Sequence, residues 1–399
     1  MLKVIKDDLR KNYYDPSFRG MDLDARFQAA DEKLREATSL GHVFGIIAQA
    51  LLDLNDSHTF FIPPPRNLRT EYGFQMKMIG GTCYIIAVKP GSDAETKGLK
   101  PGDEVYSLEG FQPTRENLWK LAYLYYTLRP RPGLRLALRG SAGSQKQVDV
   151  LARVRQERQV LDLTGPDIGD IIREAEDEGH LRRHRYQEFG DDLLIWKMPA
   201  FDLDADSVDR VMKRARKFKA LILDLRGNSG GAESTLLRLV GHFFDHDVRV
   251  GDVKSRKEVK PLVARTRGEH AFRGKLVVLV DSQSASAAEL FARVVQLEHR
   301  GTVLGDHTAG AVMRAKFYQH EMGQAQITFY GALITEADVI MADGQSLEKR
   351  GVAPDEVILP SPADLAAKRD PVLSRAAALV GVIIDAQEAG ALFPIEWRK

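Results

Sequence analysis

The sequence predicts a multidomain α/β protein, and three features support this fold class. Apolar runs at 220–225 and 276–280 each have the pattern of a strand buried on both faces, and each is followed by a loop and a helical pattern. Helical spacing of apolar residues covers 1–55, and short strand patterns separated by Gly and Pro fill 72–154. The alternation of strands and helices in the second half predicts a mostly parallel sheet with right-handed crossovers.

Composition excludes several classes of protein. Of the 399 residues, 44% are hydrophobic and 28% are charged, and the net charge is +1, so no nucleic-acid partner is indicated. No segment approaches the length of an apolar membrane span, so no integral membrane segment is expected. The single Cys83 rules out an internal disulfide and a cysteine-based metal site. We expect no metal and no cofactor.

The first ten residues, MLKVIKDDLR, lack the long apolar core of a signal peptide. The compartment stays open on this evidence. It is periplasmic or secreted if an export signal has been removed ahead of residue 1, and cytoplasmic otherwise.

The patterns divide the chain into five parts. Apolar spacing in the first part predicts helices up to the corner Asn55-Asp56-Ser57-His58, followed by a short strand at 59–62. A histidine at such a corner serves either as a capping or surface group or as a catalytic base. The predicted parts are a helical domain at 1–71, a β-rich unit at 72–154, a linker at 155–190, an α/β core at 191–360, and C-terminal helices at 361–399. The linker contains a helical run near 168–179.

Within the core, we expect separate strands at 326–330 and 338–341. The two buried strands end in loops of chemical interest, and active groups are expected at the carboxyl ends of parallel strands. One loop is RGNSGG at 226–231, and the other is the elbow DSQSASAAE at 281–289, with a helix predicted from Ala285. A phosphate-binding role for RGNSGG fails because no Gly-Lys-Ser/Thr follows.

Ser286 lies on the first turn of that predicted helix. Unpaired backbone N–H groups and the positive end of the helix dipole suit a nucleophile whose intermediate carries an oxyanion. The alternative is an ordinary serine N-cap.

The β-rich unit resembles a PDZ domain in its order of elements and in the stretch at 90–105, PGSDAETKGLKPGDEV. This resemblance implies that a peptide strand is added beside the sheet. The N–H groups of the loop Tyr72-Gly73-Phe74 would hold its terminal carboxylate. A PDZ fold used only as a structural wedge is the alternative.

Four motifs together resemble the C-terminal processing peptidases, also called tail-specific proteases: ALILDLRGNSGG, KLVVLVDSQSASAAELFA, GTVLGDHTAG and EKRGVAPD. The likeness extends from about residue 56 to residue 360. It implies an α/β core of the ClpP/crotonase type with Ser286 as nucleophile. It also assigns the N–H groups of Gly230 and Ala287 to the oxyanion.

One departure changes the expected base. Ala311 occupies the position of the lysine used by the bacterial and chloroplast enzymes, and Lys316 is interpreted as a solvated strand residue. A Ser–Lys dyad is therefore not supported. The tricorn-type branch of the same family instead carries a Ser-His pair before the PDZ position and a glutamate in an ExxGVxPD-like run.

That branch implies His58 as general base, Ser57 as an orienting or linking residue, and Glu348 completing the relay. The chemistry is consistent, because a serine needs a base of near-neutral pKa and a histidine needs a partner that fixes its tautomer. His307 is the fallback base.

The resemblance implies a serine endopeptidase that cleaves unfolded or flexible polypeptides through an acyl-enzyme, with the PDZ-like unit positioning substrate. The alternative is a proteolytically inactive peptide- or lipid-binding protein on the same scaffold. An acyl hydrolase or crotonase-like enzyme would leave the PDZ-like unit without a role. Larger relatives form rings or trimers, but the sequence of this chain shows no interface, so a homo-oligomer stays an open expectation.

Overall fold

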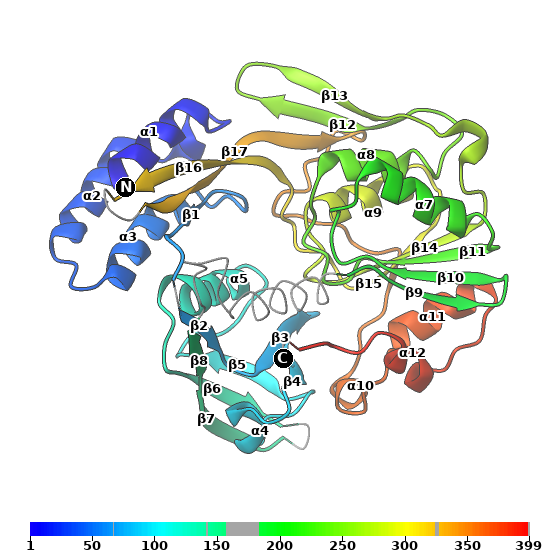
Figure 1. The fold of residues 1–399 in the computed structure, drawn as a ribbon, viewed down its shortest axis with the longest axis horizontal. Helices are drawn as coiled ribbons and strands as arrows, with labels where there is room; N and C mark the ends of the chain where they lie inside the picture. The colour runs from blue at the N-terminus through cyan, green and yellow to red at the C-terminus, as the bar shows by residue number, and fades with distance from the viewer. Residues whose placement is uncertain (67, 141–142, 157–182, 324–326, 398–399) are drawn as a thin grey trace, which may run out of the picture.

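The fold is that of a computed structural model, in which a helical cluster and a β-rich unit lie on one side of a larger α/β core (Figure 1). The N-terminal helices and the β-rich unit come from the first part of the chain, and the core and the C-terminal helices from the rest (Figure 1). The structure describes residues 1–66, 68–140, 143–156, 183–323 and 327–397.

The core is built on a six-stranded sheet in the order β18-β15-β14-β11-β10-β9. All neighbouring pairs are parallel except β9 with β10, which confirms the predicted mostly parallel sheet. Every residue of β11 is buried, and every residue of β14 after Lys275 is buried as well, because helices cover both faces of the sheet. The strands are β9 (Arg185–Phe189), β10 (Leu193–Lys197), β11 (Ala220–Asp224), β14 (Lys275–Val280), β15 (Thr302–Gly305) and β18 (Glu356–Val357).

Alternate residues of these strands supply two separate apolar cores. Leu194 and Trp196 face α7 (Ala205–Ala215), α8 (Glu233–Val240) and α9 (Ala287–Leu297). Leu193 and Ile195 face α11 (Pro371–Val380) and α12 (Ala386–Leu392), which lie on the opposite face of the sheet (Figure 1). The short helix α10 (Pro362–Ala366) precedes them.

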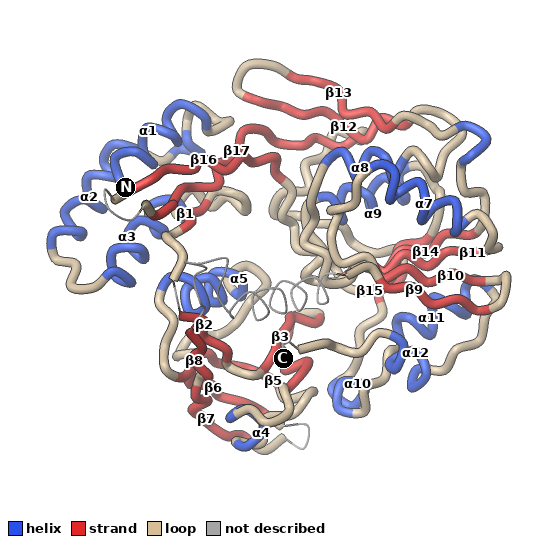
Figure 2. Tube along the Cα trace, in the orientation of Figure 1, coloured by secondary structure: helices blue, strands red, loops and turns tan. Residues whose placement is uncertain are grey.

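A second sheet, which the sequence analysis missed, connects the core to the N-terminal helices (Figure 2). Its strands β1, β17, β12 and β13 follow in that order, and β16 also pairs with β17. All described neighbours are antiparallel, including the hairpin of β12 and β13. The strands are β1 (Phe60–Ile62), β12 (Val248–Ser255), β13 (Val259–Ala264), β16 (Met313–Met322) and β17 (Thr328–Met341).

The prediction of separate strands at 326–330 and 338–341 is wrong, because β17 is one strand of 14 residues. Polar residues in its middle interrupt the apolar pattern and imitate a loop. One of them, Thr335, is fully buried and hydrogen-bonded to Thr59 and Asp56, so the strand continues through it.

The N-terminal helices and the short strand β1 agree with the pattern predicted for the first 62 residues. They are α1 (Leu2–Asn12), α2 (Leu23–Arg35) and α3 (Leu40–Leu52), with a short turn, η1 (Phe18–Gly20), between the first two. Tyr330, Ala332 and Ile334 of β17 belong to the same apolar core as these helices. The cluster therefore depends on a strand from the far end of the chain.

The β-rich unit is a five-stranded antiparallel sheet in the order β3-β4-β5-β6-β7, with β3 at an edge. A two-stranded pair, β2 with β8, lies beside it (Figure 1). The strands are β2 (Leu68–Glu71), β3 (Phe74–Ile79), β4 (Thr82–Val88), β5 (Glu104–Leu108), β6 (Gly133–Arg139), β7 (Gln145–Leu151) and β8 (Arg153–Gln156), and the helical segments are α4 (Asp93–Thr96), α5 (Leu118–Ala122) and η2 (Tyr123–Leu128).

The segment predicted as a linker, 155–190, begins and ends in strands. β8 reaches its first residues and β9 occupies 185–189. The helical run expected near 168–179 lies outside the described residues. Across the described part of the chain, no helix combines the length and apolar character needed to cross a bilayer.

Candidate active site

Ser286 occupies a sharp turn between β14 and α9. Its φ of 56° and ψ of −119° are rare for a residue with a side chain. The helix begins at Ala287, so the prediction that it begins at Ala285 is wrong by two residues. The turn is held by the Ser286 N–H, which donates to Ala311 O at 2.9 Å and to Glu289 Oε2 at 3.1 Å. This strained backbone presents the serine ahead of the helix.

The Gly-rich loop after β11 lies directly against this serine. A Cβ atom placed on Gly230 would come within 2.6 Å of Ser286 Cβ and 3.1 Å of its Oγ, so only glycine allows this approach. The Gly230 N–H donates to Asn228 Oδ1 at 2.8 Å. The donor assigned to the oxyanion is thus engaged inside its own loop and would have to leave Asn228 to serve that role. The assignment of Ala287 stays a prediction.

Ser57, His58 and Glu348 form a continuous hydrogen-bonded group. Ser57 Oγ lies 2.7 Å from His58 Nδ1 and donates to Glu348 Oε2 at 2.7 Å. The Ser57 N–H also donates to Glu348 Oε1 at 3.1 Å. Ser57 and Glu348, which are 291 positions apart, are therefore joined at the corner between α3 and β1. The sequence analysis expected Ser57, His58 and Glu348 to lie together.

This arrangement fixes the proton on the imidazole. The single hydroxyl proton of Ser57 goes to the Glu348 carboxylate, so Ser57 Oγ can only accept from His58. Nδ1 then carries the ring proton and Nε2 keeps its lone pair. A neutral histidine in this tautomer is suited to act as a base through Nε2.

Two residues that the sequence analysis overlooked support the relay. Asp56 is buried and accepts from Tyr13 Oη, Thr335 Oγ1 and the His58 N–H at 3.0, 2.7 and 2.8 Å. Arg19 lies 3.7 Å from Asp56 and 4.0 Å from Glu348, bridging the two carboxylates. The position of Asp56 directly before the Ser-His pair was an available signal, whereas nothing in the pattern around Arg19 indicated its role.

Burial shapes the electrostatics of the relay. It lowers the pKa of His58, Asp56 opposes this by attraction, and Lys349 lowers the pKa further by repulsion. Burial raises the pKa of Glu348, and the nearby Asp56 adds to this, while the Ser57 hydrogen bond and Lys349 act in the opposite direction. The imidazole is therefore kept neutral at pH values where a solvated histidine is partly charged.

Residues 311 and 312 connect the relay to the serine elbow. Ala311 O accepts the Ser286 N–H, and the next N–H, that of Val312, donates to Glu348 Oε2 at 3.1 Å. Nucleophile and relay thus contact neighbouring peptide groups of one loop. Among the described residues, no hydrogen bond joins Ser286 Oγ directly to His58.

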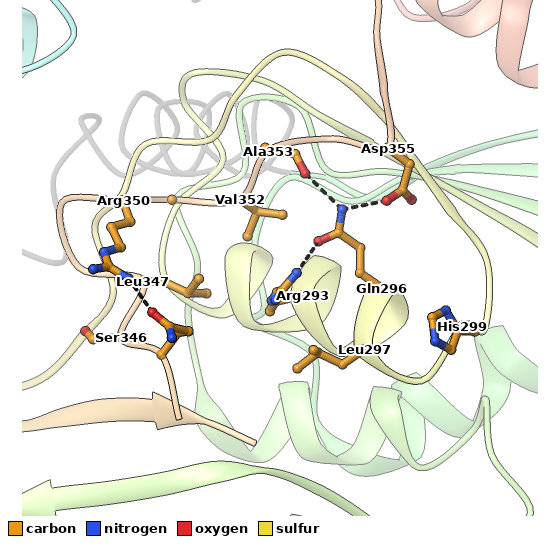
Figure 3. Close-up of a pocket in the computed structure, with 12 residues that line it drawn as sticks. Arg293, Gln296, Leu297, His299, Ser346, Leu347, Arg350, Val352, Ala353 and Asp355 are labelled. Atoms are coloured by element: carbon orange, nitrogen blue, oxygen red, sulfur yellow. Dashed lines mark hydrogen bonds between the residues drawn. The ribbon is translucent and has the colours of Figure 1, made fainter. Parts of the chain in front are cut away.

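The segment that carries Glu348 is anchored on α9, the helix that begins after Ser286. Gln296 Nε2 donates to Ala353 O at 2.9 Å and to Asp355 Oδ1 at 2.8 Å, and Arg293 donates to Gln296 (Figure 3). These side chains line a cavity of about 500 Å³ between the helix and the segment (Figure 3). One helix therefore helps to position both the elbow and the glutamate.

Glu289 is a further site residue that the sequence analysis missed. It is fully buried, and its carboxylate accepts from Thr308 Oγ1 at 2.5 Å and from the N–H groups of Gly310, Ala311 and Ser286 at 2.8, 2.9 and 3.1 Å. Burial raises its pKa to about 7, although four donors favour the ionised form. Its place three residues after Ser286 in the small-residue run could have identified it.

His307, the fallback base, is directed elsewhere. Its Nδ1 lies 3.3 Å from Thr308 O, and its backbone O accepts from Arg115 of the β-rich unit at 2.9 Å. Lys316 is exposed on β16, as expected of a solvated strand residue. Within the described residues, no group of three His, Cys, Asp or Glu side chains is arranged to hold a metal ion.

The loop expected to bind a peptide carboxylate is tightly packed. Tyr72 is buried and its hydroxyl donates to Tyr125 O and Arg131 O, so only its backbone is available to a ligand. Gly73 has a φ of 73°, and a Cβ there would meet Ser92 at 2.4 Å. Phe74 is 5% exposed and begins β3.

A second cavity, of about 320 Å³, opens beside Ser57. Its walls are mainly aromatic, and they come from β1 and from α5 and η2 of the β-rich unit. The lining residues are Ser57, Phe60, Trp119, Ala122, Tyr123, Tyr126 and Thr127.

Part of the chain is similar to a known protein family. Residues 192–358 match peptidase family S41. The tail-specific protease of Haemophilus influenzae is 26% identical over 359 residues, which cover 84% of this chain and 48% of that protein.

Two further comparisons extend over most of the chain. A Streptomyces coelicolor protein named as a homologue of tricorn protease is 25% identical over 393 residues, covering 93% of this chain and 31% of that protein. The chain therefore spans less than half the length of either relative. The structure of mature CPAF shares the fold with a TM-score of 0.66 at 16% identity, covering 92% of this chain and 94% of that one.

Proposed function

We propose that this protein is a serine peptidase with tricorn-type chemistry, acting on unfolded or flexible polypeptide. The observation that carries the proposal is the Ser57 hydroxyl, which links the Glu348 carboxylate to His58 Nδ1. It leaves Nε2 as the basic atom of a half-buried imidazole. The names of the relatives, proteases throughout, support the same reaction class.

In this proposal, Ser286 Oγ attacks the scissile carbonyl while His58 Nε2 accepts the hydroxyl proton. The tetrahedral intermediate collapses as the imidazolium donates that proton to the leaving amine, which gives an acyl-enzyme. Water, activated by the same imidazole, then releases the acid. Glu348 stabilises the transient positive charge through Ser57 rather than by direct contact.

The experiment compares wild type with Ser286→Ala on casein and with a fluorophosphonate probe. Wild type should cleave casein and bind one probe per chain at Ser286, and the variant should do neither. Equal cleavage by the two proteins would refute the proposal. Binding of peptide or lipid without any acyl-enzyme would instead indicate an inactive scaffold.

We further propose that residues 72–154 act as a PDZ-like unit that guides a substrate end to the elbow. β3 is an edge strand, so its outer side can pair with an added peptide strand. Ser282, four residues before Ser286, donates to Met78 O of that strand at 2.5 Å. A peptide beside β3 would therefore approach the serine elbow.

A direct measurement tests this guidance. One peptide is offered with a free C-terminal carboxylate and again as its amide. The free acid should be cleaved with a lower KM, because the loop at 72–74 binds a carboxylate through backbone N–H groups. Identical KM values for the two forms would contradict the PDZ-like role while leaving the peptidase proposal intact.

A further inference from the structure

A basic cavity lies at the ends of α7 and α8, in the part of the core made by these helices and the turn η3 (Gly268–His270). It has a volume of about 570 Å³, within the range of small-molecule sites. The residues that line it are Asp209, Arg210, Lys213, Arg216, Arg238, His242, Thr266, Arg267, Gly268 and His270. None of them belongs to the relay, the elbow or the β-rich unit.

The charge of this cavity is unbalanced. Asp209 is the only carboxylate among the described residues that line it, and both of its oxygens are occupied. Arg238 donates to both oxygens, and His242 Nε2 lies 2.8 Å from Oδ1. Both oxygens of this carboxylate are thus paired with one arginine and one histidine.

The other four cations form no ion pair within the described part of the chain. Arg210 donates to Ser207 Oγ and Arg216 to His270 O, which are neutral acceptors. Lys213 and Arg267 complete the set. An ordinary solvated surface would distribute acidic side chains among so many cations, because like charges at short range repel.

Helix ends explain part of this charge but not all of it. Lys213 and Arg216 lie at the end of α7 and Arg238 in the last turn of α8, where cations are favoured by the helix dipole. Arg267 lies on no helix, and its main-chain N–H is fixed to Gly241 O at 2.9 Å. Burial, followed by repulsion from Arg238, lowers its pKa, while Asp209 acts in the opposite direction, so the position is costly for a cation with no ion-pair partner among the described residues.

One buried side-chain atom of this cavity, Arg267 Nε, lacks a hydrogen-bond partner among the described residues. His242 is 3% exposed, and its ring interacts with Asp209 and with the backbone of His270, both of which act to raise its pKa against the effect of burial. Buried polar atoms of folded proteins are nearly always paired, and exceptions commonly mark a bound water or ion. The base of this basic cavity is therefore suited to polar ligand atoms.

We propose that this cavity binds a small soluble compound carrying two or more phosphate-type groups, such as a diphosphate. Guanidinium groups bind phosphate oxygens in pairs, and the cations come from several elements around one space. The volume exceeds that needed for a single phosphate. This inference does not depend on the peptidase proposal, because no residue is shared with the candidate active site.

The test is calorimetric titration of the full chain with pyrophosphate, with NaCl used to keep the ionic strength constant. Arg267→Ala should weaken binding by about tenfold or more, the effect of losing one charge-assisted hydrogen bond. The matched control is Arg265→Ala, which removes an equal charge two residues away from an arginine already paired with Asp247. It should change binding by less than about twofold.

A second pair of variants guards against misfolding. Lys213→Ala should weaken pyrophosphate binding, whereas Arg214→Ala, on the same helix but paired with Glu188, should not. No heat of binding beyond a NaCl control, or equal loss in the variants and their controls, would overturn the inference.

A separate experiment uses vesicles that contain phosphatidic acid. Competition with pyrophosphate identifies a lipid headgroup as a source of the phosphate, and its absence leaves soluble compounds.

Discussion

Ser57 has a chemical role that its neighbour His58 cannot take for itself. Its oxygen accepts a hydrogen bond from the imidazole while its proton is donated to Glu348. The carboxylate therefore acts on the imidazole through two hydrogen bonds, with the Ser57 hydroxyl between them. A direct His–carboxylate contact would hold the ring more simply. The serine instead separates two groups whose burial shifts their pKa values in opposite directions.

Ser57→Ala should therefore reduce kcat/KM by about 10²- to 10⁴-fold, the usual range for a general-base function. The loss should fall mainly on kcat, with a changed pH profile, because Ser57 positions the base rather than the substrate. Ser17→Ala is the control, since the hydroxyl of that serine donates to Asp15 in the helical cluster. Unchanged kcat in Ser57→Ala would show that His58 works without this link.

The pH dependence of the reaction gives a second prediction at this scale. His58 must be neutral to act, and its lowered pKa places the acid limb of kcat/KM below that of an ordinary histidine. Because Lys349 contributes to the lowering, Lys349→Met should raise the pKa of His58 and move the acid limb to higher pH. Lys316→Met, an exposed lysine on β16, should leave the limb in place. A shift toward lower pH would contradict the assignment of His58.

At the scale of elements, Glu289 joins the start of α9 to the loop after β15. Four donors from two segments converge on one carboxylate. Glu289→Gln should destabilise the fold by about 2–4 kcal/mol, because the amide supplies one acceptor oxygen and leaves buried N–H groups unpaired. Chemical denaturation measures this, with Glu298→Gln at the end of the same helix as control.

The sign of the pH effect follows from the raised pKa. Between the ordinary value of 4.5 and about 7, folded Glu289 holds a proton that the unfolded chain has released. Its contribution to stability is therefore present at low pH and is lost as pH rises through this window. The advantage of wild type over Glu289→Gln should shrink from pH 5 to pH 8. A growing advantage would mean that the four hydrogen bonds outweigh burial.

The elements themselves were largely predictable from local patterns. The buried runs of β11 and β14, the helices before residue 55 and the antiparallel strands of the β-rich unit all carry strong periodicity. β17 was divided into two predicted strands because its buried polar residue Thr335 is satisfied by partners from residues 56 and 59. Such pairing between distant segments leaves no local trace.

The candidate site divides in the same way. Ser57, His58, Ser286 and Glu348 were named from motifs, and the structure joins Ser57, His58 and Glu348 by hydrogen bonds. Their catalytic roles stay predictions. Arg19 could not be predicted, because its role comes from meeting two carboxylates only after folding. The engagement of Gly230 by Asn228 likewise depends on a loop conformation that no spacing rule encodes.

At the scale of the whole molecule, the β-rich unit docks on the two loops that frame the elbow. Lys77 pairs with Asp281 at 2.9 Å, and Arg115 donates to Gly80 O, His307 O and Asp306 Oδ2. The Gly80 N–H reaches Asp306 as well, at 2.8 Å. Movement of this unit would therefore displace the loop that holds Ser286.

Arg115→Ala should loosen this docking. Hydrogen exchange at residues 306–311 should quicken, and kcat should fall several-fold, because Ala311 O helps to hold the Ser286 turn. Arg139→Ala is the control, since that exposed arginine pairs with Glu104 inside the β-rich unit. Exchange rates equal to those of the control would show that the two units are held together by other contacts.

The long strand β17 has a consequence for how the protein is made. It completes the apolar core of the helices that precede His58, and Glu348 follows it by seven residues. While a ribosome is still translating the middle of the message, the histidine has emerged without its carboxylate and without a finished scaffold. The hydrogen-bonded group of Ser57, His58 and Glu348 can therefore form only after this strand and the segment that follows it have been synthesised.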